Sequence, residues 1–332
     1  MRIASVSVVA ALCTLSDGPA ASYGCSLLEP ASATPSTMII RQVWATAPLG
    51  LNATAISPDG RYLVYAGPGQ DRPEGTVLYV RDLSGGLSRP LTPADSAGFI
   101  VSAVFSPDSR VVGLTWYNGV RDDLREIMLD GSTGTRIPYR SDEWPHLAMV
   151  AWSRDGQQML MALKSGPRAR QTRHIGVMSV QDGSIRILET LGMQHFPSLG
   201  GFSIDGRYII YDSPALGDSG ERDIVILGTG GARPVRLVSR AADDHNPYFT
   251  PDGRGVLFFS GGAGEPVSAW YQRVADGNPQ GSPELLRQDM GPTAKPIGFS
   301  SNGSFYYHIH SDSLNMRAVW VMEDFLPGDP AR

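Results

Sequence analysis

Residues 201–213 read Gly-Phe-Ser-Ile-Asp-Gly-Arg-Tyr-Ile-Ile-Tyr-Asp-Ser, a turn followed by an apolar run. Ser203 can hydrogen-bond to the backbone that follows it, Asp205 tolerates unusual backbone angles, and Gly206 adopts positive φ without strain. The run Tyr208–Tyr211 is continuously apolar, which is typical of a strand covered on both faces. The stretch therefore predicts a tight hairpin that leads into a buried strand.

This phrase occurs six times along the chain. The copies are AISPDGRYLVYAG from Ala55, VFSPDSRVVGLTW from Val104, AWSRDGQQMLMAL from Ala151, GFSIDGRYIIYDS from Gly201, YFTPDGRGVLFFS from Tyr248 and GFSSNGSFYYHIH from Gly298. The Asp or Asn of each turn follows the previous one by 49, 47, 50, 47 and 50 residues. Self-similarity at a fixed period of this length indicates one repeat domain.

Each unit continues with a third strand, such as Leu78–Asp82, and a short fourth strand, such as Ile185–Leu188 or Val235–Val238. Four strands in 40 to 50 residues are typical of a propeller blade. The 38 glycines and 25 prolines, about a fifth of 332 residues, agree with many tight turns. The sequence predicts an all-β, six-bladed β-propeller of four-stranded antiparallel blades.

The last unit lacks a fourth strand. Its third strand falls at Ala318–Met322, and the chain then leaves through Leu326-Pro327-Gly328. The β-prone segment Met38–Val43 precedes the first unit and has no partner of its own. We expect this N-terminal segment to join the last blade as its outer strand and so close the ring.

The N-terminus resembles a signal peptide, with Arg2, an apolar run from Ile3 to Leu15, and small residues at Ala20 and Ala21. The expected organisation is a signal peptide at 1–21, a disordered linker at 22–37, one propeller domain at 38–326 and a tail at 327–332. No later segment is long and apolar enough for a transmembrane helix. We expect an exported protein, periplasmic or secreted, in a bacterial envelope.

The charge and the cysteine content limit the partners and the covalent cross-links that we expect. The formal net charge of −5 and the absence of a Lys/Arg cluster argue against nucleic acid as a partner. Both cysteines, Cys13 and Cys25, lie in or beside the leader, so no disulfide is expected in the domain, and Cys25 is read as an unpaired residue rather than a lipid attachment site. We expect a monomer.

The phrases FSPDSR, FSIDGRYIIY and FTPDGRGVLFF resemble the repeat of TolB-type propellers, and this resemblance spans Met38 to Asp324. It implies that the phrase forms the turn between the innermost and second strands of each blade, so its Asp and Gly residues are structural. The repeat is also similar to the propellers of prolyl-oligopeptidase-type peptidases, but no nucleophile elbow occurs in the sequence. Motifs of zinc proteases, P-loops and dinucleotide sites are also missing.

Three histidines, His146, His195 and His245, each precede a repeat phrase by a few residues, where the chain enters an innermost strand. Imidazoles that converge on a channel mouth could bind Zn or Mn, with Glu143 or Asp243 and Asp244 completing the shell. Some propeller lyases that act on uronic acid sugars bind a metal through such histidines. A divalent metal is therefore the one cofactor that the sequence suggests, and a structural role for these histidines is the alternative.

Loops at strand ends supply the other candidates for partner contact, because loops carry function on a rigid scaffold. These candidates are Tyr117, Trp144, Asp243, Asp244 and Asn246. The favoured function is a non-catalytic binding module for a protein, peptide or glycan. Two alternatives stay open: a metal-dependent polysaccharide lyase or hydrolase, and a sensor or regulatory propeller that partners a separately encoded kinase or peptidase.

Overall fold

Six antiparallel sheets account for the six repeat units. The structure is a computed structural model that describes residues 38–46, 52–69, 72–93, 98–130, 132, 144–167, 170–193, 197–216, 220–261, 266–291, 293–311 and 316–326. Residues 36–332 form one compact unit. The described ranges contain no α-helix, and so no helix that could span a membrane. The predicted signal peptide and linker, residues 1–37, lie outside the described residues.

Each sheet is one blade. The strands of blades one to three are β2 (Asn52–Ile56), β3 (Tyr62–Gly69), β4 (Arg72–Asp82), β5 (Ser88–Pro90), β6 (Phe99–Phe105), β7 (Val111–Tyr117), β8 (Asp122–Met128), β9 (His146–Trp152), β10 (Gln158–Ser165), β11 (Thr172–Ser179) and β12 (Ile185–Gly192). The strands of blades four to six are β13 (Leu199–Phe202), β14 (Tyr208–Pro214), β15 (Arg222–Gly228), β16 (Val235–Val238), β17 (Asp244–Phe249), β18 (Gly255–Ser260), β19 (Ser268–Ala275), β20 (Asn278–Arg287), β21 (Lys295–Phe299), β22 (Phe305–Ser311), β23 (Met316–Glu323) and β1 (Ile39–Thr46).

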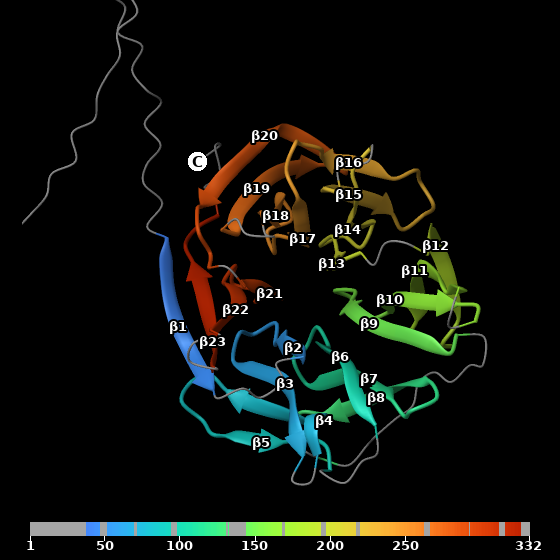
Figure 1. The fold of residues 1–332 in the computed structure, drawn as a ribbon, viewed down its shortest axis with the longest axis vertical. Coiled ribbons are helices and arrows are strands. Elements are labelled where there is room, and N and C mark those ends of the chain that lie inside the picture. The colour runs from blue at the N-terminus through green and yellow to red at the C-terminus, as the bar shows by residue number, and fades with distance from the viewer. Residues whose placement is uncertain are drawn as a thin grey trace, which may run out of the picture. The chain divides into compact units, whose positions relative to one another are not determined.

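The blades follow one another around a ring, and the first strand of each blade lies nearest the centre (Figure 1). Five blades have four strands, while blade two has three strands among the described residues. The residues that follow β8, 133–143, are not described, so a fourth strand there is untested. The predicted six-bladed, all-β fold is confirmed.

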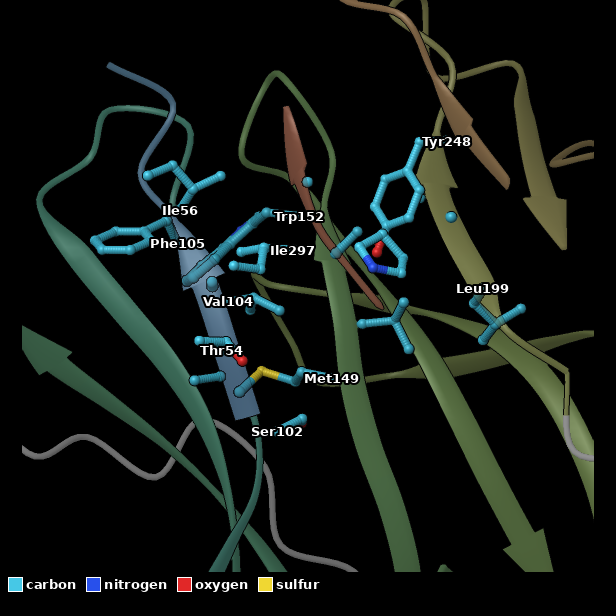
Figure 2. A pocket seen from close by; sticks show the side chains of 18 of the residues that line it. Thr54, Ile56, Ser102, Val104, Phe105, Met149, Trp152, Leu199, Tyr248 and Ile297 are labelled. Atoms are coloured by element: carbon cyan, nitrogen blue, oxygen red, sulfur yellow. The ribbon is translucent and has the colours of Figure 1, made fainter. Parts of the chain in front are cut away.

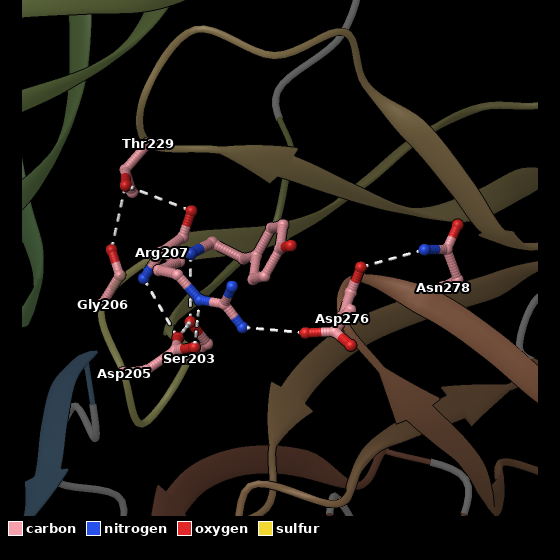
Figure 3. Close-up of polar contacts among 8 residues, drawn as sticks. Ser203, Asp205, Gly206, Arg207, Thr229, Asp276 and Asn278 are labelled. Carbon is pink, nitrogen blue, oxygen red and sulfur yellow. Dashed lines mark hydrogen bonds and ion pairs between the residues drawn. The ribbon is translucent and has the colours of Figure 1, made fainter.

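The repeat turn is held by its own side chains, as Figure 3 shows for blade four. Ser203 Oγ donates to Asp205 Oδ1 at 2.6 Å, and the Arg207 amide donates to the same oxygen at 3.1 Å. The contact from Ser or Thr to Asp or Asn recurs in all six turns, including Ser300 to Asn302 at 2.7 Å. These bonds satisfy turn groups locally, which explains why the phrase is repeated.

The core lies between the blades. Each of six clusters of buried side chains takes its residues from two neighbouring blades. On β14, Ile209 and Tyr211 pack in the cluster with blade three, whereas Ile210 packs in the cluster with blade five. Successive side chains of a strand point to opposite faces of its sheet. A strand whose blade is covered by a neighbouring blade on each face must therefore be apolar at every position. This explains the continuous apolar runs after each turn.

The chain ends meet in blade six. Strand β1 pairs antiparallel with β23 from Ile39 opposite Glu323 to Thr46 opposite Arg317, with a register shift between Gln42 and Trp44. The sheet order β1-β23-β22-β21 makes β1 its outer strand, as predicted. Figure 1 shows β1 running along the outside of β23, so the first described strand completes the last blade.

Candidate functional site

A central channel of about 630 Å³ runs through the ring and is lined by the innermost strands β2, β6, β9, β13, β17 and β21. Each of these strands pairs with its neighbour through a register shift. A β-bulge bends the strand and leaves an extra residue unpaired. The residues at five of these shifts, including Val101, Val150 and Gly200, line the channel, so the bulges help to shape its wall.

The side chains of the channel wall are uncharged and mostly apolar, while backbone polar groups make up much of the rest of its surface. Among the described residues that line it, none is ionised at neutral pH; Ala, Val, Ile, Leu and aromatic residues dominate. Of its few hydroxyl groups, Ser102 already donates to Thr115 Oγ1 at 3.0 Å. Burial raises the pKa of Tyr248 to about 12, so this phenol stays neutral at physiological pH. Figure 2 shows Val104, Leu199, Tyr248 and Ile297 among the side chains of this wall.

Aromatic side chains gather where the channel meets the repeat turns, which we name the turn end. Phe105, Trp152, Phe202, Phe249 and Phe299 stand directly before the Ser or Thr of five phrases, and Ile56 holds this position in the sixth. The five aromatic residues line both the channel and a second cavity of about 440 Å³, whereas Ile56 lines the channel alone. We call the five aromatic residues the aromatic collar. Figure 2 shows Ile56, Phe105 and Trp152 at the same end of the channel.

The second cavity opens beyond the collar. Its rim carries Pro58, Pro107 and Pro251 from three turns, together with Ile204, which is 39% exposed, and Arg154. A mouth rich in proline and aromatic residues favours contact with apolar segments of a partner. The sequence carries a signal for this feature in the repeat phrase itself, because an aromatic residue precedes the turn in five copies of six.

Two of the predicted histidines, His146 and His245, lie at or near the start of innermost strands, and neither lines the channel. His146 is the first residue of β9, and its Nδ1 lies 3.3 Å from Asp122 Oδ2. His245 is buried in β17; its Nε2 lies 2.9 Å from the Gly261 carbonyl, and its Nδ1 lies 2.8 Å from Asn246 Nδ2. Burial lowers the pKa of His245. His195 lies outside the described residues.

No three His, Cys, Asp or Glu side chains are grouped as metal ligands within the described parts of the chain. A site that includes His195 or Glu143 is not tested by this, because neither residue is described. The metal hypothesis therefore stays a prediction.

The acidic contact candidates belong to an ion-pair network between blades four and five. Arg222 donates to both Asp243 oxygens at 2.7 and 2.6 Å, and Arg240 donates to both Asp244 oxygens at 3.0 and 2.6 Å. Asp244 is fully buried. The Asn246 amide donates to Asp212 Oδ2 at 3.3 Å, and Asn246 has a φ of 52°. These contacts hold the start of β17 in place.

The two aromatic contact candidates differ in exposure. Trp144 is buried in the cluster between blades two and three, and its ring meets that of His174 edge-on at 5.3 Å. Tyr117 is partly exposed and packs between Phe99 at 5.0 Å and His146 at 6.0 Å, while its hydroxyl donates to the Gly119 carbonyl. Of this pair, Tyr117 is the one available at the surface.

Solved structures with the same fold include TolB proteins and a lyase. TolB from Acinetobacter baumannii is 14% identical with a TM-score of 0.56, over 80% of this chain and 65% of that one. A protein assigned as a TolB from Agrobacterium tumefaciens is 20% identical with a TM-score of 0.57, over 88% and 98%. An oligogalacturonate lyase from Vibrio parahaemolyticus is 11% identical with a TM-score of 0.57, over 88% and 96%.

These likenesses show that the chain has the fold of TolB-like six-bladed β-propellers. The chain spans about two thirds of the Acinetobacter TolB. No protein-family model matches the sequence, and no curated protein does so. Because propellers of one fold serve unrelated functions, the function must be argued from the channel and its mouths.

Proposed function

We propose that this protein is a non-catalytic binding propeller that holds an extended, mainly apolar peptide segment of a partner in its central channel. The observation that carries the proposal is the channel of about 630 Å³, which is lined by uncharged, mostly apolar side chains and ends in the aromatic collar. This volume lies within the range of about 300–1,000 Å³ that is usual for ligand pockets.

The chemistry of the wall favours a peptide over a glycan. A sugar presents hydroxyl groups in many directions, and polar side chains that could reach them are few in the wall. A peptide in extended form presents apolar side chains and a regular row of backbone donors and acceptors. The six innermost strands each stand at the end of their sheet, so their channel-side edges can bond to such a backbone.

Selection of linear peptides of twelve residues from a displayed random library would test the proposal. Binders selected on the wild-type protein should weaken by more than about tenfold with Val101→Asp, because that variant places a charge in the apolar channel. Val101 lines the channel and is already 37% exposed, so the fold should accept the change. Val120→Asp is the matched control, since Val120 is 80% exposed and lies outside the channel.

Selected peptides that bind Val101→Asp as tightly as the wild type would overturn the channel as the binding site. A selection that yields no peptide above background would overturn the peptide-binding function itself.

Export from the cytoplasm is a separate proposal that rests on the resemblance of the first 21 residues to a signal peptide. The intact mass of the protein recovered from an envelope fraction would test it. A mass that corresponds to loss of residues 1–21 supports export, and the full-length mass in the cytosolic fraction contradicts it.

A further inference from the structure

A third cavity extends outward from the turn end. It has a volume of about 360 Å³ and lies between blades two and three. We name it the interblade groove, and the residues that matter for its chemistry are Asp108, Val111, Glu126, Trp152, Arg154 and Asp155. Trp152 lines the channel, the second cavity and the interblade groove, and Arg154 lines the last two. The three cavities are therefore neighbours that share the same indole.

The close packing of the Trp152 ring against blade two depends on a glycine in that blade. A Cβ added at Gly113 on β7 would lie 3.2 Å from the Trp152 ring, so this glycine allows the indole to pack close over blade two. Trp152 Nε1 donates to the Gly156 carbonyl at 3.3 Å, which ties the ring to its own turn. The indole thus forms a fixed apolar surface where the groove meets the channel.

The interblade groove differs from the channel in charge. Asp108, Glu126 and Asp155 contribute three carboxylates, against the single guanidinium of Arg154. A hydrogen bond from Ser106 lowers the pKa of Asp108, and one from Ser153 lowers the pKa of Asp155, so both carboxylates are ionised at neutral pH. The lining of the groove is therefore negative on balance, and the positive charge of Arg110, which lies outside the lining, acts on Asp108. The channel beside the groove is lined by uncharged side chains.

We propose that the interblade groove selects partners whose apolar segment is flanked by a lysine or arginine, which lies in the groove while the apolar part fills the channel. This inference rests on the proposed peptide-binding function. The aliphatic stem of such a side chain would lie along Val111 and the Trp152 indole, and its cationic head would reach the carboxylates. The groove thus sets specificity, and the channel supplies most of the apolar contact.

The test extends the strongest peptide from the library selection at both ends. One version carries Lys-Gly-Lys at each end, a second carries Gln-Gly-Gln, and a third carries Glu-Gly-Glu. We expect the lysine version to bind about 3- to 10-fold more tightly than the glutamine version in 0.05 M salt, and the glutamate version to bind less tightly than either. The lysine advantage should shrink at 0.5 M salt because Asp108 and Asp155 are exposed.

Asp108→Asn together with Asp155→Asn should remove most of the lysine advantage, because Glu126 is then the only carboxylate left among the lining residues, and should leave binding of the glutamine version unchanged. The chain itself shows that asparagine fits this turn, because Asn302 Oδ1 accepts from Ser300 Oγ at 2.7 Å in blade six. Asp59→Asn together with Asp252→Asn is the matched control: it makes the same change in the turns of blades one and five, which do not line the groove.

Three results would overturn the inference: equal binding of the lysine and glutamine versions, an unchanged lysine advantage in the groove variant, or an equal loss in the control variant. If no extended or parent peptide binds in the channel, the proposed function fails as well, so the two failures are distinguishable.

Discussion

The carbonyl oxygen of Pro247 occupies the space that a side chain on Gly200 would need. A Cβ added at Gly200 would lie far inside van der Waals contact with this oxygen and 2.6 Å from the Pro247 carbonyl carbon. The two residues belong to β13 and to β17, the innermost strands of blades four and five. Only glycine therefore allows these two strands to approach so closely beside the channel.

Gly200→Ala should accordingly be severely destabilising. The clashing atoms are backbone, so relief would require the two blades to separate, and we expect a loss of more than about 3 kcal/mol in the free energy of unfolding. Urea unfolding followed by circular dichroism would measure this. Gly230→Ala is the control, because a Cβ at Gly230 meets no atom within 4 Å. A Gly200→Ala protein as stable as this control would contradict the prediction.

The turns were predictable because their causes are local. Ser203 and Asp205 bond within two residues of each other, so the phrase alone specifies the hairpin. The channel chemistry was not predictable in the same way. In β9, Val150 has no pairing partner on β10, because Ala151 pairs with Leu160 and Met149 pairs with Met161. Such a bulge changes which side chains face the channel, and no residue type predicts it.

The contact candidates show the same limit. The sequence predicts Asp243 as a residue that contacts a partner, but in the structure its carboxylate is bound by Arg222 of β15, 21 residues away. Pairing over such a distance depends on how the blades stack, which a single phrase does not encode. The ring closure was predictable for a simpler reason: the last unit lacked an outer strand, and Met38–Val43 lacked a partner.

Trp44 should be the main anchor between the two ends of the ring. Its ring lies 4.8 Å from that of Tyr65 in blade one, and the Arg81 guanidinium lies 5.1 Å from its centre. We expect Trp44→Ala to lower the free energy of unfolding by about 2–3 kcal/mol, less than for a fully buried tryptophan because Trp44 is only partly buried. Urea midpoints would measure the loss.

Ile39→Ala provides the comparison for Trp44→Ala, since Ile39 lies on the same strand and is 47% exposed. It should cost less than about 1 kcal/mol. Equal effects of the two variants would mean that the contacts of Trp44 with blade one contribute little to closure.

His308 should make stability depend on pH between about 6.5 and 4. It is 6% exposed, its Nδ1 has no hydrogen-bond partner among the described residues, and burial lowers its pKa to about 4. The positive charges of Arg317 and Lys295 act in the same direction. The unfolded chain takes up a proton near pH 6.5, whereas the folded protein does so only near pH 4. The stability is therefore complete above pH 6.5 and is lost as the pH falls.

His308→Phe should remove roughly 2–3 kcal/mol of this pH dependence, because phenylalanine does not titrate in either state. Urea unfolding at pH 7.5, 6.0, 5.0 and 4.5 would compare the slopes of wild type and variant, with Tyr307→Phe as a control for substitution on the same strand. Parallel curves for wild type and His308→Phe would show that His308 is not the titrating group.

Metal analysis addresses the histidines at the start of the innermost strands. The Gly261 carbonyl requires His245 Nε2 to carry the proton, and Asn246 Nδ2 then donates to Nδ1, so neither nitrogen offers a free lone pair to a metal. We expect protein dialysed against Zn or Mn and then against buffer to retain well under one equivalent. The measurement is elemental analysis beside a protein determination. One retained equivalent that disappears with His146→Ala, His195→Ala and His245→Ala combined, but persists with His174→Ala, would reverse this expectation and bring a metal-dependent reaction to the fore.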